Sequence, residues 1–205
     1  EKVARVFEDM IRRSVPGYES LIPMMGMIAS AFARPGTNCY DLGSSLGATA
    51  VSMAGGIPES ETCRIFAVDR SPSMIRESRT VMKTFGTECV SLICADIRSI
   101  RIIRASLVAL NFTLQFLPPE ERSAMLRTIY MGLLPGGALV LSEKIVFEDD
   151  KEQHFQNNLH LAFKKFHGYS DLEISQKRTA LERIMMPETA EAHVHRLQAA
   201  GFSTV

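Results

Sequence analysis

One stretch decides the fold, and it reads Asn38-Cys39-Tyr40-Asp41-Leu42-Gly43-Ser44-Ser45-Leu46-Gly47-Ala48-Thr49-Ala50. An apolar run ends near Asp41, a turn with two glycines follows, and a helical pattern opens at Ala48. This order predicts a strand, a tight loop and the start of a helix. We expect the free N–H groups of the loop to point into one concave space, where the helix N-terminus adds partial positive charge. Glycine lets a ligand approach the backbone closely, because it has no Cβ.

The spacing of the glycines narrows the kind of ligand. Ser45 stands where the dinucleotide fingerprint G-x-G-x-x-G has its second glycine, which disfavours a hydride-transferring dehydrogenase. The loop is closer to the acidic-x-Gly-x-Gly-x-Gly loop of S-adenosylmethionine (SAM) enzymes, with the middle glycine replaced. On this stretch alone, an ordinary strand-to-helix turn remains the alternative.

Length and composition agree with one α/β domain. The chain has 205 residues, 46% of them hydrophobic, and a formal net charge of +0 from 23 basic and 23 acidic residues. This size allows a sizeable core, and the neutral balance argues against nucleic acid as a direct partner. No apolar run approaches the ~18 residues of a membrane span, and no signal peptide is recognised. We therefore expect a cytoplasmic protein without membrane contact.

Cysteine and histidine spacing gives no sign of a metal site. The four cysteines, Cys39, Cys63, Cys89 and Cys94, show no C-x-x-C spacing and lie in or beside apolar strand candidates. We expect buried, reduced thiols, which suits a cytosolic protein. The pair His193-x-His195 does not lie on one helix face and has no carboxylate partner, so no metal is expected.

Apolar runs and helical patterns alternate along the chain. The expected strands cover 38–42, 64–68, 90–95, 106–111 and 138–142, and the helices between them cover 48–53, 73–84 and 119–134. Short apolar runs between helices are typical of a parallel sheet covered on both faces. We predict one doubly wound, mostly parallel α/β domain over 1–205, with N-terminal helices in 1–34 and a helical insertion over 147–190, after the fifth strand. We also expect that residues are missing from both ends.

Ligands of doubly wound sheets bind beyond the carboxyl ends of the strands, so the residues there are the candidates. Asp69 ends the second strand and can accept hydrogen bonds from both hydroxyls of a ribose, or instead cap the next helix. Asp96 follows the third strand and either accepts from the amine of a base or is a surface turn residue. Asn111 ends the fourth strand, where a buried amide must either brace the loop or meet a ligand.

Four segments resemble the carboxy-S-adenosyl-L-methionine synthases, a family of the class I SAM-dependent methyltransferases with a Rossmann-like fold. They are RSVPGY (13–18), YDLGSSLGA (40–48), LNFTLQFL (110–117) and GYSDLEISQKR (168–178). The resemblance covers essentially the whole chain, and by comparison residues before Glu1 and a final strand pair after Val205 are absent. The family often has Cys where this chain has Ser44, a mild change because the backbone makes the contact.

The resemblance implies conversion of SAM and prephenate to carboxy-S-adenosylmethionine and phenylpyruvate, for making 5-oxyacetyl-uridine at the tRNA wobble position. The sulfonium methyl would lose its proton to the hydroxide that prephenate releases, and the resulting ylide carbon would capture carbon dioxide from prephenate. No catalytic side chain is then assigned, and the site supplies proximity and a dry pocket. The resemblance also implies a homodimer, and a downstream tRNA carboxymethyltransferase that uses the product.

Carried over residue by residue, the resemblance implies ligand contacts at Tyr18, Gly43, Ser44, Ser45, Asp69, Arg70, Asp96, Ile97, Asn111 and Arg178. Arg178 distinguishes carboxyl from methyl transfer, because a guanidinium pairs with a new carboxylate through two hydrogen bonds. Ser170 and Glu173 form a capping box that starts the helix carrying it. Without the resemblance, Arg178 is a solvated charge beside Lys177 and Tyr18 a packing residue. A conventional small-molecule methyltransferase and a catalytically silent binding module are the alternative functions.

Two further features have open interpretations. Arg12 and Arg13 could bind an anionic substrate or face water, and we favour water. The predicted helix over 152–166 carries an apolar stripe suited to core packing or to a dimer contact. The stripe consists of Phe155, Leu159, Ala162, Phe163 and Phe166.

Overall fold

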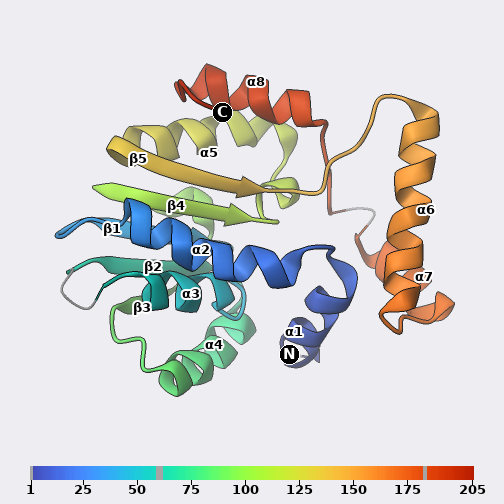
Figure 1. Ribbon diagram of the computed structural model, residues 1–205, viewed down its shortest axis with the longest axis horizontal. Coiled ribbons are helices and arrows are strands. Elements are labelled where there is room, and N and C mark those ends of the chain that lie inside the picture. The colour runs from blue at the N-terminus through green and yellow to red at the C-terminus, as the bar shows by residue number, and fades with distance from the viewer. Residues whose placement is uncertain (1, 59–61, 182–183) are drawn as a thin grey trace.

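A five-stranded parallel sheet organises the protein (Figure 1). The computed structural model describes residues 2–58, 62–181 and 184–205, without the side chains of 2–5, 177, 178, 180 and 181. The strands are β1 (Asn38–Leu42), β2 (Arg64–Asp69), β3 (Val90–Cys94), β4 (Ala105–Asn111) and β5 (Leu133–Ser142). Their order is β3-β2-β1-β4-β5, so the winding reverses between β1 and β4. This arrangement confirms the predicted doubly wound fold.

Helices cover both faces of the sheet, because alternate strand residues point to opposite sides. The helices are α1 (Lys2–Ser14), α2 (Tyr18–Phe32), α3 (Ala48–Gly56), α4 (Pro72–Phe85), α5 (Pro119–Gly132), α6 (Asp150–Phe166), α7 (Asp171–Leu181) and α8 (Ala190–Ala200), with short 3-10 turns η1 (Ile97–Ser99) and η2 (Leu114–Phe116). Cys39 and Ile65 pack with α2, α3 and α4 in one core cluster. Tyr40 and Val108 pack with α5 and α8 in the other. Asp41 therefore shares the face of α2 and α3.

The boundary between α5 and β5 differs from the prediction. The sequence predicts helix to 134 and strand from 138, whereas α5 ends at Gly132 and β5 begins at Leu133. Leu133 pairs with Ala105 and Ala138 with Leu107, so 134–137 form an irregularity in the ladder. The Pro-Gly-Gly sequence at 135–137 explains it, because Pro breaks a helix and Gly136 adopts a positive φ of 72°.

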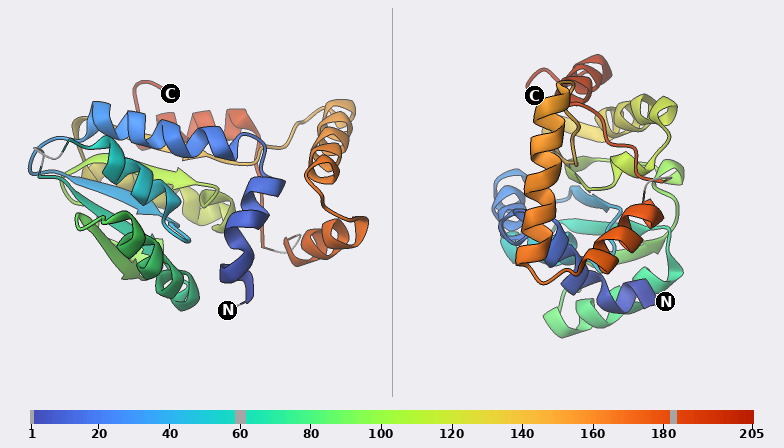
Figure 2. Two further views of the ribbon diagram at one scale, coloured as in Figure 1. Left: turned by 60° about the horizontal axis from the view of Figure 1, so that its bottom comes forward. Right: turned by 90° about the vertical axis from the view of Figure 1, so that its right-hand side faces the viewer.

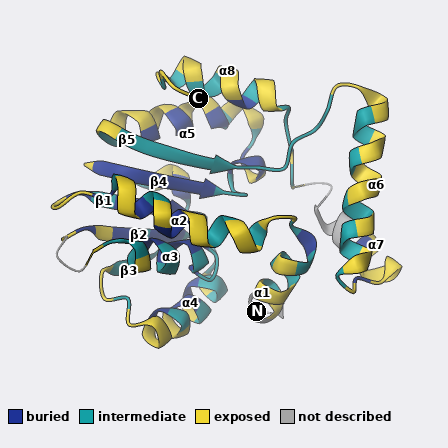
Figure 3. Cartoon of the chain, viewed as in Figure 1, coloured by how far each residue is buried: buried dark blue, intermediate teal, exposed yellow. Residues whose placement is uncertain are grey.

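The helices α6 and α7 form an arm beyond the carboxyl ends of the strands, as Figure 1 and the right-hand view of Figure 2 show. At the base of the arm, a parallel bridge between Ile145 and Glu188 joins the segment that enters α6 to the segment that precedes α8. It contacts α1, where Oη of Tyr169 donates to the carbonyl of Met10 (3.2 Å). No residue of α6 is buried (Figure 3). The predicted stripe on α6 therefore does not pack into the core of this chain.

The capping box of α7 forms as predicted. The backbone N–H of Glu173 donates to Oγ of Ser170 (3.2 Å), and Oε2 of Glu173 accepts from the N–H of Ser170 (2.8 Å).

Among the described helices, none combines the length and the apolarity that crossing a bilayer requires.

The cysteines divide into two pairs. Cys39 and Cys63 are buried, with their sulfur atoms 3.5 Å apart. Cys89 and Cys94 are exposed, so the prediction of burial is wrong for these two. Cys94 ends β3 and Cys89 directly precedes it, and β3 is the outer strand of the described sheet, which leaves both side chains uncovered.

Candidate functional site

The β1–α3 loop is tied to the end of β2. The N–H groups of Gly43 and Ser44 donate to the carbonyl of Val68 (2.8 and 2.9 Å), and the N–H of Ser45 donates to Oδ2 of Asp69 (2.9 Å). The expectation that these three groups are free is wrong, because the turn crosses the end of β2 and finds acceptors there. A ligand must therefore meet this loop through its Cα surface, its hydroxyls or its other N–H groups.

Asp69, the last residue of β2, joins this loop to the turn that starts α4. Its Oδ1 accepts from the N–H of Ser71 (2.8 Å), while Ser71 itself caps α4 by accepting from Met74. The capping alternative therefore belongs to Ser71. Each carboxylate oxygen of Asp69 has a further lone pair, so the predicted ribose contact stays compatible with these bonds.

Two loops meet at Gly43. Its φ is 84°, and a Cβ placed on it would lie 2.1 Å from Oγ1 of Thr113 in the loop after β4. Ser45 and Phe112, on either side of this meeting point, also have positive φ values of 50° and 55°. Side-chain-bearing residues rarely adopt this conformation, and it is concentrated at functional sites.

Buried polar atoms without a protein partner gather at the same place. Within the described part of the chain they include Oδ2 of Asp41, Oγ of Ser44 and Oδ1 of Asn111. Nδ2 of Asn111 donates to Oγ1 of Thr49 (3.1 Å), so this amide braces α3 while its oxygen stays open. All three atoms lie at the carboxyl ends of β1 and β4, where the winding of the sheet reverses. Because buried acceptors normally have donors, the site is suited to a ligand that brings them.

Electrostatics single out Asp41. Burial raises the pKa of Asp41 to about 7, opposed by a hydrogen bond from the N–H of Ala50 and reinforced by the charge of Asp69. Burial, with the charge of Asp41, also raises the pKa of Tyr18 to about 12. Tyr18 is half-buried at the start of α2 and lines a pocket between α1, α2 and α6.

Asp96, which follows β3, already has partners for its carboxylate. The carboxylate of Asp96 accepts from Nε and Nη2 of Arg98 (2.8 and 2.6 Å), and these bonds lower its pKa to about 2. Asp96 also caps η1, so it has the role of a turn residue, and its contact with a base stays a prediction. Ile97 is buried beneath this turn, whereas Arg70 is exposed and adds positive charge beside Asp96.

Glu143 is a site residue that sequence reasoning missed. It follows β5 directly, and its carboxylate accepts from the N–H groups of Thr113 (3.1 Å), Leu114 (2.7 Å) and Gln115 (3.1 Å). Burial raises its pKa to about 7. The available signal was an acid directly after the fifth apolar run, the same pattern that drew attention to Asp69.

Comparison with known proteins identifies the family. Residues 40–137 match a family model described as a methyltransferase domain. The carboxy-S-adenosyl-L-methionine synthase of Geobacter sp. (strain M21) is 54% identical over 206 residues, which cover 100% of this chain and 84% of that protein. The enzyme of the same name from Shewanella loihica (strain ATCC BAA-1088 / PV-4) is 53% identical over 204 residues, covering 99% and 84%. The chain belongs to the carboxy-S-adenosyl-L-methionine synthase family.

Solved structures of methyltransferases share the fold. The apo form of the SAM-dependent methyltransferase SibL gives a TM-score of 0.65 at 19% identity, over 92% of this chain and 50% of that one. The mitomycin 7-O-methyltransferase MmcR gives 0.59 at 15% identity, over 88% and 47%. At these identities the likeness concerns the fold alone, which is the class I methyltransferase fold.

The family supplies a ligand, SAM, against which the geometry can be tested. The methionine part of SAM carries an ammonium group with three donors and no acceptor. Oδ2 of Asp41, Oγ of Ser44 and Oδ1 of Asn111 are buried acceptors without partners, which suits such a group. At Gly43 the missing Cβ makes room for Thr113, so the loop after β1 and the loop after β4 pack directly against each other beside these acceptors. The residues present therefore fit SAM.

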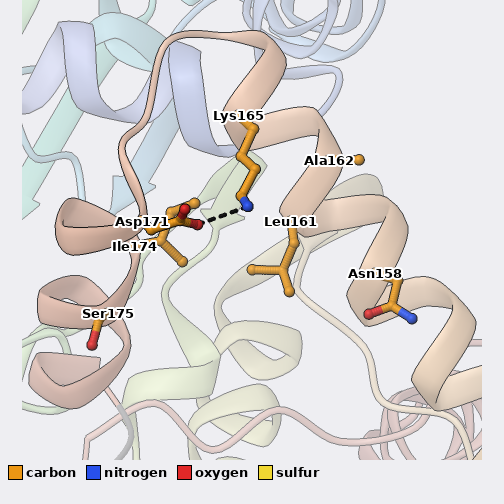
Figure 4. Close-up of a pocket in the computed structure, with 7 residues that line it drawn as sticks. All are labelled: Asn158, Leu161, Ala162, Lys165, Asp171, Ile174 and Ser175. Atoms are coloured by element: carbon orange, nitrogen blue, oxygen red, sulfur yellow. Dashed lines mark ion pairs between the residues drawn. The ribbon is translucent and has the colours of Figure 1, made fainter.

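Arg178, the residue predicted to bind a carboxylate, lies on the arm. The backbone of Arg178 belongs to α7, but its side chain lies outside the described residues, so its contact with a carboxylate stays a prediction. Figure 4 shows the pocket between α6 and α7, which Lys165 and Asp171 bridge with an exposed ion pair of 2.7 Å. Such a pair contributes little stability, and the pocket is separate from the strand ends.

Arg12 and Arg13 have partners of their own. Arg12 pairs with Glu8 (2.8 Å) and Arg13 with Asp9 (2.6 Å), one helical turn back on α1. The side chain of Arg12 is 53% exposed, which agrees with the interpretation that it faces water.

Proposed function

We propose that this chain is a carboxy-S-adenosyl-L-methionine synthase that converts SAM and prephenate to carboxy-S-adenosylmethionine and phenylpyruvate. The observation that carries the proposal is 54% identity over the full chain to a protein of that name. As its ring becomes aromatic, prephenate releases carbon dioxide and hydroxide. The hydroxide takes a proton from the sulfonium methyl group, and the carbon dioxide bonds to that carbon. Atoms and charge balance without a protein base, so no side chain receives a catalytic role.

The residues of the site then hold and orient the reactants. Asp41, Ser44 and Asn111 accept from the ammonium group, and Asp69 accepts from the ribose hydroxyls. Asp96 and Ile97 meet the base, and Arg178 pairs with the new carboxylate. Holding both reactants in a dry pocket accounts for the rate, because the step needs proximity and the exclusion of water.

We also propose a cytoplasmic homodimer whose product is used to modify the wobble uridine of tRNA. On α6, Phe155, Leu159 and Phe166 are 59%, 55% and 87% exposed, which supports covering by a second copy. The neutral net charge favours a downstream tRNA enzyme over direct tRNA binding by this chain.

Mass spectrometry of the nucleoside product tests the reaction. Incubation with SAM and prephenate should give a product heavier by one carboxyl group, and omission of prephenate should abolish it. A conventional methyltransferase, which the methyltransferase-domain match also allows, would instead give S-adenosylhomocysteine and a methylated acceptor. The appearance of those two products without carboxylation would reject the proposal.

Arg178→Ala tests the discriminating contact. It should weaken binding of the carboxylated product by about 2–5 kcal/mol, because one charge is left unpaired, and SAM by much less. Calorimetry measures both affinities. Equal weakening of SAM and of the carboxylated product would show that Arg178 does not bind the carboxylate.

A further inference from the structure

We propose that Glu143 is a positioning residue for SAM: its carboxylate holds the loop after β4 against Gly43 and thereby shapes the floor of the nucleoside site. The proposal rests on SAM binding at the strand ends and does not depend on carboxyl transfer. Glu143 would act through the loop, without touching the reacting atoms.

The carboxylate takes three consecutive backbone donors. Oε1 accepts from Thr113 (3.1 Å) and Leu114 (2.7 Å), and Oε2 accepts from Gln115 (3.1 Å). These N–H groups open η2, whose own N-cap residue, Thr113, makes no side-chain capping bond. Glu143 therefore caps this turn from a different part of the chain, directly after β5. The positive end of the turn favours a negative charge there.

The loop needs this support because its conformation is unfavourable. Phe112 has a φ of 55°, which side-chain-bearing residues rarely adopt. Thr113 is pressed onto Gly43, and its Oγ1 donates to the carbonyl of Asn111 (3.2 Å). Release of the three N–H groups would let Thr113 leave Gly43 and would free the backbone next to Asn111. Gly43 and Asn111 are both predicted SAM contacts.

The surroundings of Glu143 leave the peptide donors as its main partners. Among the described charged groups, Arg122 on α5 acts on Glu143 and opposes the rise in its pKa. Arg122 is itself paired with Glu188, to which Arg196 on α8 also bonds. The backbone N–H of Lys144 donates to Oε1 of Gln115 (3.4 Å). The ionised carboxylate is the form that can accept all three peptide N–H groups.

Glu143→Gln tests the proposal by calorimetry with SAM. The amide oxygen can still accept from two N–H groups, but the amide NH₂ would face the N–H of Gln115, donor against donor. We expect the Kd for SAM to rise about tenfold or more near pH 8. We also expect a weaker pH dependence of the Kd between about pH 6 and pH 8, because Asp41 is then the remaining titrating carboxyl of the site. Titration of the ligand's own amine is common to both proteins and cancels.

Two controls separate positioning from folding. Glu148→Gln makes the same chemical change at an exposed residue nearby and should bind SAM as the unchanged protein does. Ile65→Val thins the core cluster on the other face of the sheet, which contains no residue of the loop after β4, and lowers Tm. Unchanged affinity in Glu143→Gln would overturn the proposal. So would a loss that is uniform across pH and matched by Ile65→Val. If carboxyl transfer fails while these binding results hold, the proposed reaction is rejected and the role of Glu143 stands.

Discussion

At the scale of single residues, the site depends on atoms that the fold leaves in unusual states. Gly43 touches Thr113 where any side chain would collide, and Asp41 is buried with one oxygen unpaired. Both states cost stability in the free protein, the first through backbone strain and the second through desolvation. A bound ligand offsets the second cost, because it brings the missing donor.

Gly43→Ala should abolish measurable SAM binding and lower Tm. The new Cβ would clash with Thr113, and a φ of 84° adds roughly 1–2 kcal/mol of strain. Gly36→Ala is the matched control, since Gly36 has a φ of 70° with no atom near the added Cβ. It should lose stability by the strain alone and keep its SAM affinity in calorimetry. Equal affinities of the two variants would contradict the contact.

Asp41→Asn should move affinity and stability in opposite directions. Loss of the charge facing the ligand's ammonium should weaken SAM binding by about 1.5–3 kcal/mol. Near pH 8 the ligand-free variant should unfold at the same or a higher temperature, because burial raises the pKa of Asp41 to about 7 and its charge is disfavoured in the fold. Calorimetry and thermal melts measure the two effects. A parallel fall of both would point to a purely structural aspartate.

At the scale of elements, Arg122 on α5 holds the segment between α7 and α8 to the body of the protein. This guanidinium is fully buried, and it donates to the carbonyls of Leu117 (3.0 and 2.9 Å) and Met186 (2.7 Å) and pairs with Glu188. It thus connects the end of the loop after β4 to the segment that follows α7. The outer face of α6 has no such anchor within the described chain and carries its apolar side chains in solvent.

Phe155→Glu with Leu159→Glu should turn the proposed dimer into a monomer. Two charges would enter an apolar contact without partners, whereas in the isolated chain both positions are exposed and tolerate them. Light scattering after size-exclusion chromatography reads the change, with Lys151→Glu as an exposed control on the same helix. If the unchanged protein is already monomeric at micromolar concentration, the dimer proposal fails.

At the scale of the whole molecule, the free protein carries two carboxyls that folding disfavours as anions. Burial raises the pKa of Asp41 from 3.8 and that of Glu143 from 4.5, each to about 7. The unfolded chain therefore binds fewer protons than the folded one between these values. Their stabilising contribution is complete at low pH and is lost as pH rises towards 7.

The free energy of unfolding of the ligand-free protein should consequently fall between about pH 5 and pH 7. Each carboxyl contributes up to roughly 1.4 kcal/mol per pH unit. His193 opposes this, because burial lowers its pKa and favours folding as pH rises. Urea unfolding across this range measures the slope, and Asp41→Asn with Glu143→Gln should remove the fall. A fall of the same size in the double variant would place its origin elsewhere.

The sequence by itself determined the succession of strands and helices along the chain and placed Asp69, Asp96 and Asn111 at the ends of strands. It also determined the family to which the chain belongs. These features are readable because apolar periodicity and turn residues act over a few neighbours. Tertiary structure alone decided that the N–H groups of Gly43 to Ser45 are taken by β2, that Glu143 holds the loop after β4, and that Arg122 is buried. Each of these depends on partners that are distant in the chain, which only the folded sheet brings within hydrogen-bonding distance.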